Sequence, residues 1–169
     1  MTKLMALAVA LLVAAPAFAQ TSINLGGIRA DSSAPVEVAA DSLSIDQDSG
    51  TAVFTGNVVV GQGDLRLSAG SVRVVYSDET GDIAQLIASD GVTFVTDTEA
   101  AEAQNAVYNL VTGVLTLTGD VLLTQGASAL SAEQMTVNIN TGAAQMSGRV
   151  RTVFPVPYTH LNPPTIHPF

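Results

Sequence analysis

The sequence predicts an all-β protein built from stacked repeats, and three observations support this prediction. Apolar and polar residues alternate in short runs from Val36 onward, which is the period of a β-strand. Turn-forming residues such as Asp48-Ser49-Gly50 and Gly56-Asn57 separate the runs. The stretch TGNVVVGQGDLRLSA at 55–69 returns as TGDVLLTQGASALSA at 118–132, a displacement of 63 residues. A fixed period is typical of folds in which each unit buries its apolar face against the next.

Composition limits the kind of core and the kind of partner. The chain has 169 residues, which suits one domain, and it has no Trp and only 5% aromatic residues, so the core must be aliphatic. Its net charge of −9 repels phosphate backbones, so we expect no nucleic-acid partner. The absence of Cys excludes disulfides, thiolate metal sites and Cys nucleophiles.

The N-terminus predicts export from the cytoplasm. Lys3, the apolar stretch Leu4–Ala15 and the sequence Ala17-Phe18-Ala19 form a secretory signal peptide over residues 1–19. The alternative is an uncleaved membrane anchor, but an anchor needs about 20 apolar residues. Cleavage before Gln20 would release the protein into a bacterial periplasm. Residues 20–35 are polar and aperiodic and are expected to form a flexible lead-in.

The β-domain is predicted over residues 36–154. Its expected strands contain the alternating apolar sets Leu43/Ile45, Val58/Val60, Leu65/Leu67, Val72/Val74/Tyr76, Val92/Phe94, Val114/Thr116 and Met135/Val137/Ile139. The segment Thr98–Ala106 has no clear apolar stripe and is interpreted as a loop or a poorly specified strand. Residues 155–169 contain five of the seven Pro and both His, and are predicted to be disordered or to come from a truncated or misread reading frame.

Aligning the two copies indicates which residues face inward. Positions that are apolar in both copies alternate with polar ones, so period two places the first set on an inner face. Arg66 and Arg73 fall on the outer face. The predicted inner face is therefore aliphatic and almost without charge.

The repeats resemble the OstA-like (LptA) family of lipopolysaccharide transport proteins. The similarity rests on Ala40-Asp41-Ser42-Leu43 with Asp46, then Gly56-Asn57-Val58, Gly63-Asp64 and the following Leu67, Ala69-Gly70, Val72 and Val74. A more divergent second copy runs from Ala103 to Ile139, and the resemblance covers about residues 35–154.

The resemblance implies a fold and a function. It implies an elongated, partly open antiparallel β-jellyroll, whose two facing sheets hold the acyl chains of lipid A in an apolar interior. It also implies a periplasmic location and head-to-tail self-association through edge strands. The partners would be LptC-like in the inner membrane and LptD-like in the outer membrane, with no cofactor and no enzymatic activity.

The expected site is a lining rather than a reactive cluster. Shielding an acyl chain from water contributes about 0.8 kcal/mol per methylene, whereas an exposed ion pair to a headgroup contributes about 0–1 kcal/mol. The candidate lipid-binding residues are Ile45, Phe54, Val58, Val60, Leu67, Val72, Val74, Phe94, Tyr108, Leu117, Val121, Leu123, Met135 and Val137. The candidate assembly edges are Val36, Val38, Val150 and Val153. Each lining residue has simple core packing as its alternative role.

Catalytic and metal-binding interpretations have little support in the sequence. Asp46 with Asp48, and Asp78-Glu79 with Asp82, are explained by turns, where Asp bonds its own backbone. No calcium-loop pattern and no G-x-S-x-G elbow occur. Two other functions stay open: a β-stack enzyme that modifies polysaccharides, and a structural filament-forming β-protein.

Overall fold

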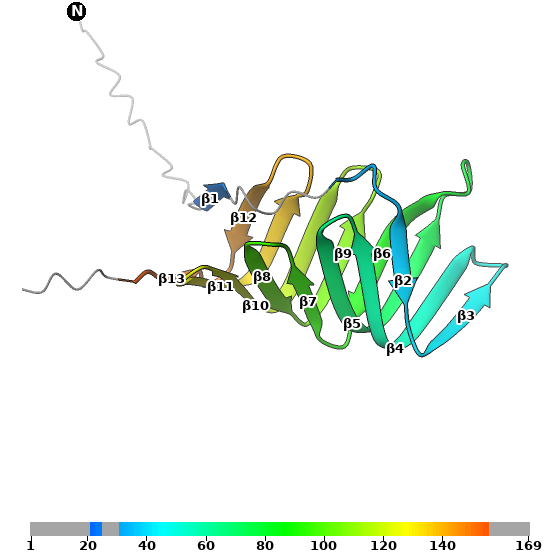
Figure 1. Ribbon diagram of the computed structural model, residues 1–169, viewed down its shortest axis with the longest axis horizontal. Coiled ribbons are helices and arrows are strands. Elements are labelled where there is room, and N and C mark those ends of the chain that lie inside the picture. Colours follow the sequence, from blue (N-terminus) through cyan, green and yellow to red (C-terminus); the bar gives the residue numbers. More distant parts are fainter. Residues whose placement is uncertain (1–20, 25–30, 156–169) are drawn as a thin grey trace, which may run out of the picture.

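The computed structural model describes residues 21–24 and 31–155, and in this part of the chain every element is a β-strand. The predicted signal peptide and residues 156–169 of the Pro-rich tail lie outside it. The strands form one elongated antiparallel sheet of thirteen strands, with β3 at one end and β1, β12 and β13 at the other (Figure 1). They are β1 (Thr21–Asn24), β2 (Val36–Ala39), β3 (Ser42–Asp46), β4 (Thr51–Gln62), β5 (Leu65–Tyr76), β6 (Ile83–Ser89), β7 (Val92–Val95), β8 (Glu99–Ala103), β9 (Asn105–Asn109), β10 (Val114–Gln125), β11 (Ser128–Asn138), β12 (Ala143–Ser147) and β13 (Arg151–Val153).

Four long strands fold this sheet into two walls. Residues 51–55 of β4 pair with β3, whereas residues 59–62 pair with β2. In the same way β5 pairs with β6 and β7, β10 with β9 and β8, and β11 with β12 and β13. One wall therefore contains β3, β6, β9, β12 and β1, and the other contains β2, β7, β8 and β13. We call them the β3 wall and the β2 wall; β4, β5, β10 and β11 belong to both.

The walls meet along a line of bends that we call the spine. In β4 and β10 the pairing register shifts at Gly56-Asn57 and Gly119-Asp120, where both residues of each pair have positive φ. Such β-bulges bend a strand sharply. The sequence had suggested turns at these positions, but both pairs lie inside continuous strands. Each long strand contributes one residue to the spine, and so does each link between two successive short strands. These residues are Asp41, Asn57, Gly70, Asp90, Gln104, Asp120, Glu133 and Arg149.

Side chains bridge neighbouring strands along the spine. Asn57 Nδ2 donates to Asp41 Oδ2 at 2.8 Å, and Gln104 Nε2 donates to Asp120 Oδ2 at 2.9 Å. These two bridges are repeat equivalents, 63 residues apart. A third bridge is the exposed ion pair of Arg149 Nε with Glu133 Oε1 at 3.2 Å.

The sequence repeat is a structural repeat. β4 and β10, and likewise β3 and β9, are displaced by 63 residues, and β2–β7 form one unit that β8–β13 repeat. Equivalent glycines have nearly equal φ, 82° at Gly56 and 84° at Gly119, and 57° at both Gly63 and Gly126. The predicted fold class, an elongated antiparallel β-jellyroll of stacked repeats, is confirmed.

Of the two interpretations of the segment Thr98–Ala106, a loop or a poorly specified strand, the strand is correct. The segment forms β8 and the start of β9, the counterparts of β2 and β3. Its Ala- and Glu-rich sequence has low β-propensity, and its pairing with β7, β6 and β10 determines its conformation.

Candidate functional site

The candidate site is the interior between the two walls, where twelve of the fourteen predicted lining residues are buried. These twelve are at most 5% exposed: Val58, Val60, Leu67, Val72, Val74, Phe94, Tyr108, Leu117, Val121, Leu123, Met135 and Val137. They belong to one apolar cluster with side chains from both walls. Arg66 and Arg73 are exposed on the outer face, as expected.

The other two predicted lining residues, Ile45 and Phe54, lie at an open end of this interior. Ile45 is 66% exposed and lies opposite the buried Ala52. Phe54 is half-buried and lies opposite Leu43, which is 51% exposed. Directly opposed residues of an antiparallel pair share a face. Leu43 and Ile45 therefore continue the inner apolar face past its buried part, to the edge of the molecule.

A hydrogen bond joins the two walls on the side away from the spine. The Tyr108 hydroxyl, on β9, donates to Gln62 Oε1 on β4 at 3.1 Å. Gln62 Nε2 in turn donates to the carbonyl oxygens of Ser32 and Ala34, at 3.2 and 3.1 Å. Burial raises the pKa of Tyr108 above its ordinary value, so the hydroxyl keeps its proton and remains a donor.

Sequence reasoning missed Gln62 and treated Tyr108 as a plain apolar lining residue. A signal was available, because Gln62-Gly63 and Gln125-Gly126 coincide in the repeat at an otherwise inward position. In the second unit Gln125 Nε2 donates to Oε1 of the buried Glu99 at 2.7 Å. Gln62 and Gln125 thus occupy equivalent positions, at the ends of β4 and β10 that lie in the β2 wall.

The comparisons with known proteins identify the family. The model of the LptA/(LptD N-terminal domain) LPS transport protein family matches residues 37–143. The chain belongs to this family. It is 33% identical over 152 residues to an uncharacterized protein of Rhizobium meliloti (strain 1021), covering 83% of this chain and 82% of that protein. It is 26% identical over 162 residues to the lipopolysaccharide export system protein LptA of Haemophilus influenzae, covering 89% of this chain and 90% of that protein.

A solved structure shares the fold of this family member. The crystal structure of LptH from Pseudomonas aeruginosa, described as the LptA-homologous periplasmic component of the lipopolysaccharide transport device, superimposes with a TM-score of 0.67. The match covers 75% of this chain and 99% of LptH, at 18% sequence identity. The family is thus one of lipopolysaccharide transport proteins, in agreement with the resemblance.

The predicted assembly residues of this family member lie at both ends of the sheet. Val36 and Val38 are half-buried on the edge strand β2, and Val153 is 66% exposed on β13. Val150 lies immediately before β13 and is 38% exposed. The free side of β12 is occupied by β1.

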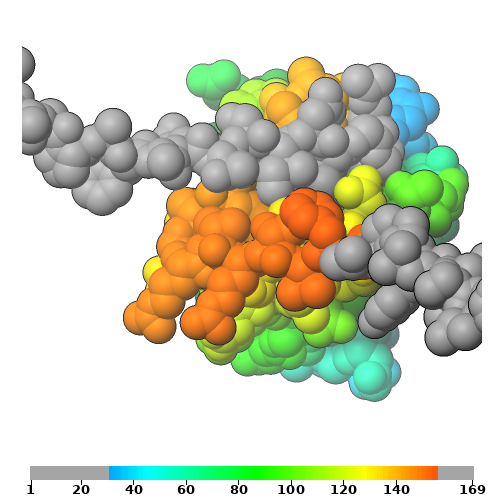
Figure 2. Space-filling view, turned by 90° about the vertical axis from the view of Figure 1, so that its left-hand side faces the viewer, coloured from blue at the N-terminus to red at the C-terminus, as the bar shows by residue number. Residues whose placement is uncertain are grey.

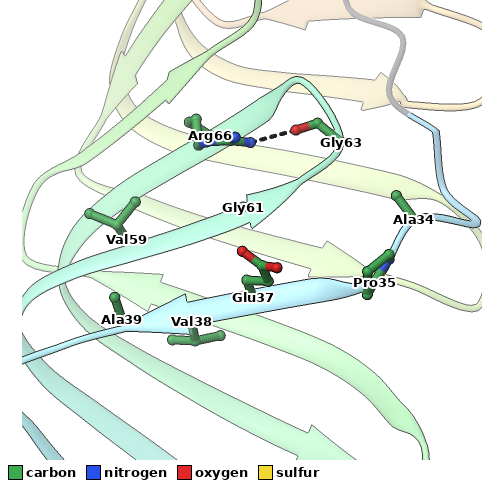
Figure 3. Close-up of a pocket in the computed structure, with 9 residues that line it drawn as sticks. All are labelled: Ala34, Pro35, Glu37, Val38, Ala39, Val59, Gly61, Gly63 and Arg66. Carbon is green, nitrogen blue, oxygen red and sulfur yellow. Dashed lines mark hydrogen bonds between the residues drawn. The ribbon is translucent and has the colours of Figure 1, made fainter.

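An outer pocket lies on the β2 wall, apart from the interior. Figure 3 shows Glu37 and Val59 on one side of the sheet and Val38 on the other. Arg66 lies across Gly61 and donates to the carbonyl oxygens of Gly63 and Leu65. This arginine is therefore engaged by backbone on the outer face.

Within residues 21–24 and 31–155, no group of three or more His, Asp or Glu side chains is arranged to hold a metal ion. The same residues contain no helix with the length and apolar character needed to cross a bilayer.

Proposed function

We propose that this chain is a periplasmic protein that binds lipopolysaccharide by enclosing the acyl chains of lipid A between its two walls. One observation supports this most directly: in a lipopolysaccharide transport family member, both repeat units present an aliphatic inner face with almost no charge. The lining runs from the open β3 end, with Ile45 and Phe54, to Met135 and Val137 in the second unit.

The energetics favour acyl chains over the headgroup as the source of affinity. Each buried methylene contributes about 0.8 kcal/mol, so several chains outweigh the one or two ion pairs that an exposed headgroup can make. The interior side chains pack against one another, so entering acyl chains replace contacts between the walls. The spine keeps the walls joined, and we propose that acyl chains enter at the β3 end and on the side of the Tyr108–Gln62 bond.

Transport across the periplasm would use the edges of the sheet, through which protomers can pair end to end. Edge strands have unpaired N–H and C=O groups that can accept a strand from another chain. We propose that β2 and β3 of one protomer meet the β12–β13 end of the next. The same edges would meet LptC-like and LptD-like partners at the two membranes, and the signal peptide would be removed during export.

Photocrosslinking between matched inner and outer neighbours tests the lipid site. A photoreactive amino acid at Val60 or Leu123, which are buried inside, should label lipopolysaccharide in cells. The same group at the adjacent Val59 or Leu122, 40% and 38% exposed on the outer face, should label it at least about tenfold less. Equal labelling of both sets would rule out the interior as the acyl-chain site.

A further inference from the structure

The junction between the two repeat units is a template for the end of the molecule. At this junction β6 of the first unit pairs with β9 of the second, with Leu86 opposite Tyr108 and Ala88 opposite Ala106. The corresponding strand at the end of the second unit is β12. A third unit, if present, would place its own copy of β9 against β12.

Each residue of β12 has an equivalent position in β6. In the first unit Val74 of β5 pairs with Leu86, and in the second unit Val137, its repeat equivalent, pairs with Ala144. Ala144 therefore corresponds to Leu86. By the same step Met146 corresponds to Ala88.

β1 pairs with β12 in the register that a third unit would use. Ile23 lies opposite Ala144 and Thr21 lies opposite Met146. Ile23 thus occupies the position of Tyr108, whose equivalent in the first unit is Ile45. The N-terminal strand stands where β3 of a following unit belongs.

The sequences agree with this placement. Residues 21–24 read Thr-Ser-Ile-Asn and the equivalent residues 43–46 of β3 read Leu-Ser-Ile-Asp. The two central residues are identical, and Asn and Asp have nearly the same shape.

We propose that β1 is an internal mimic of β3 that caps the β12 edge and competes there with β3 of a second copy of this chain. The inference rests on the head-to-tail association in the proposed function. Capping covers the β3 wall, whereas β13 of the β2 wall pairs only with β11 among the described strands. Figure 2 looks onto this end of the molecule, with β12 and β13 in orange to red facing the viewer. A second copy first pairs its β2 with β13, and its β3 then displaces β1.

A strand of the same chain is a strong competitor, because its effective concentration is in the millimolar range. The apparent Kd of association therefore exceeds the intrinsic Kd by the inverse of the uncapped fraction. Removing the cap should lower this Kd by at least about tenfold.

The same substitution in the two competing strands gives a matched test. Ladder bonds alternate along a strand. The N–H of Ile139 donates to the Gly113 carbonyl oxygen, and following the alternation from there across β11 and β12 shows that the N–H of Ile23 points toward β12. The N–H of Tyr76 donates to the Gly50 carbonyl oxygen, and following the alternation from there across β4 and β3 shows that the N–H of Ile45 points toward the open edge. Proline removes that donor in either place. Ile23→Pro should lower the Kd of end-to-end association at least about tenfold, measured by sedimentation velocity of the exported chain. Ile45→Pro should abolish association both in the wild-type chain and in the Ile23→Pro variant.

Two further variants act in the opposite direction from Ile23→Pro. Thr21→Leu with Asn24→Asp makes residues 21–24 identical to residues 43–46, and should strengthen the cap and weaken association. Ser22→Cys with Gln145→Cys joins opposed residues of β1 and β12 in a chain without native Cys. The pair lies between the bonded positions, where Cα atoms are about 4.5 Å apart, within disulfide range. The oxidised chain should remain monomeric and associate after reduction.

The outcomes separate this inference from the function on which it rests. If Ile45→Pro abolishes association but Ile23→Pro and the disulfide leave the Kd unchanged, β1 is not a competitor and the inference fails alone. If no variant associates, including Ile23→Pro, the head-to-tail part of the proposed function fails and the inference fails with it.

Discussion

At the scale of single residues, the bends of β4 and β10 each depend on a glycine with almost no room around it, Gly56 and Gly119. Gly56 has φ of 82°, and a Cβ added there would lie 2.6 Å from Asp41 Oδ2. Asp41 is held in place, because Asn57 donates to its carboxylate and its own N–H donates to the Gly56 carbonyl at 2.9 Å. Both the torsion and the space therefore require glycine.

Gly56→Ala should lower the free energy of unfolding by about 2 kcal/mol, since it adds backbone strain and a steric clash. Urea denaturation of the purified chain measures this change. Gly61→Ala is the control: its φ is not positive, and its new Cβ would meet only the side chain of Arg66, which can move. Equal losses in the two variants would contradict the role given to Gly56.

At the scale of elements, the Tyr108–Gln62 bond connects β9 of one wall with β4 of the other. Tyr108→Phe keeps the ring but leaves Gln62 Oε1 buried without that donor. Such a loss should destabilise the fold by about 1–2 kcal/mol. Because the bond holds the walls together, the same variant should take up a fluorescent acylated probe faster in stopped-flow measurements. Slower or unchanged uptake would show that this bond does not restrict entry.

The same residue predicts a pH dependence. Burial raises the pKa of Tyr108, so the folded state retains a proton that the unfolded chain releases near pH 10. Stability from this group is complete below about pH 10 and declines as the pH rises further. Chemical denaturation between pH 8 and 11 should therefore show a shallower loss for Tyr108→Phe than for the wild type.

Most of the elements could be predicted from the sequence because their period is simple. Val58, Val60, Val72 and Val74 alternate without interruption, and their copies coincide after a shift of 63 residues. β8 could not be predicted, because Glu99–Ala103 consists of Ala and Glu and is a strand through its neighbours. The inner face followed from period two, whereas the Gln62 contact with Tyr108 depends on how two distant strands cross.

At the scale of the whole molecule, the two ends of the sheet differ in charge. The β2–β3 end carries Glu37, Asp41 and Asp46, whereas at the other end Arg149 is paired with Glu133 and the neighbouring Arg151 lies on β13. At the junction of the two units, Thr93 of β7 lies opposite Glu102 of β8. Arg151 of β13 is the repeat equivalent of Thr93, and Ala39 of β2 is the repeat equivalent of Glu102, so the same register would place Arg151 opposite Ala39 of a second copy. Arg151 then lies diagonal to the second copy's Glu37 on the outer face, within reach of a long side chain.

Arg151→Glu should weaken end-to-end association by about two- to fivefold, the effect of one exposed pair. The charge swap Arg151→Glu with Glu37→Arg should restore the wild-type Kd, since every junction then has the pair reversed. Sedimentation velocity at low ionic strength measures both effects. A double variant weaker than the single one would contradict the predicted register.

The spine defines two dimensions of the molecule, the depth of the walls on either side of it and the length along it. On each side of it the long strands run five residues, as in 51–55 and 58–62 of β4, which corresponds to a depth of about 17 Å. That depth depends on strand length alone, and the length of the molecule along the spine depends on the number of units. A chain becomes longer by adding one more 63-residue unit, but it becomes deeper only if every strand lengthens at once. If the chain functions as proposed, fatty acids of different length and membranes of different separation would therefore act on independent features of the same sequence.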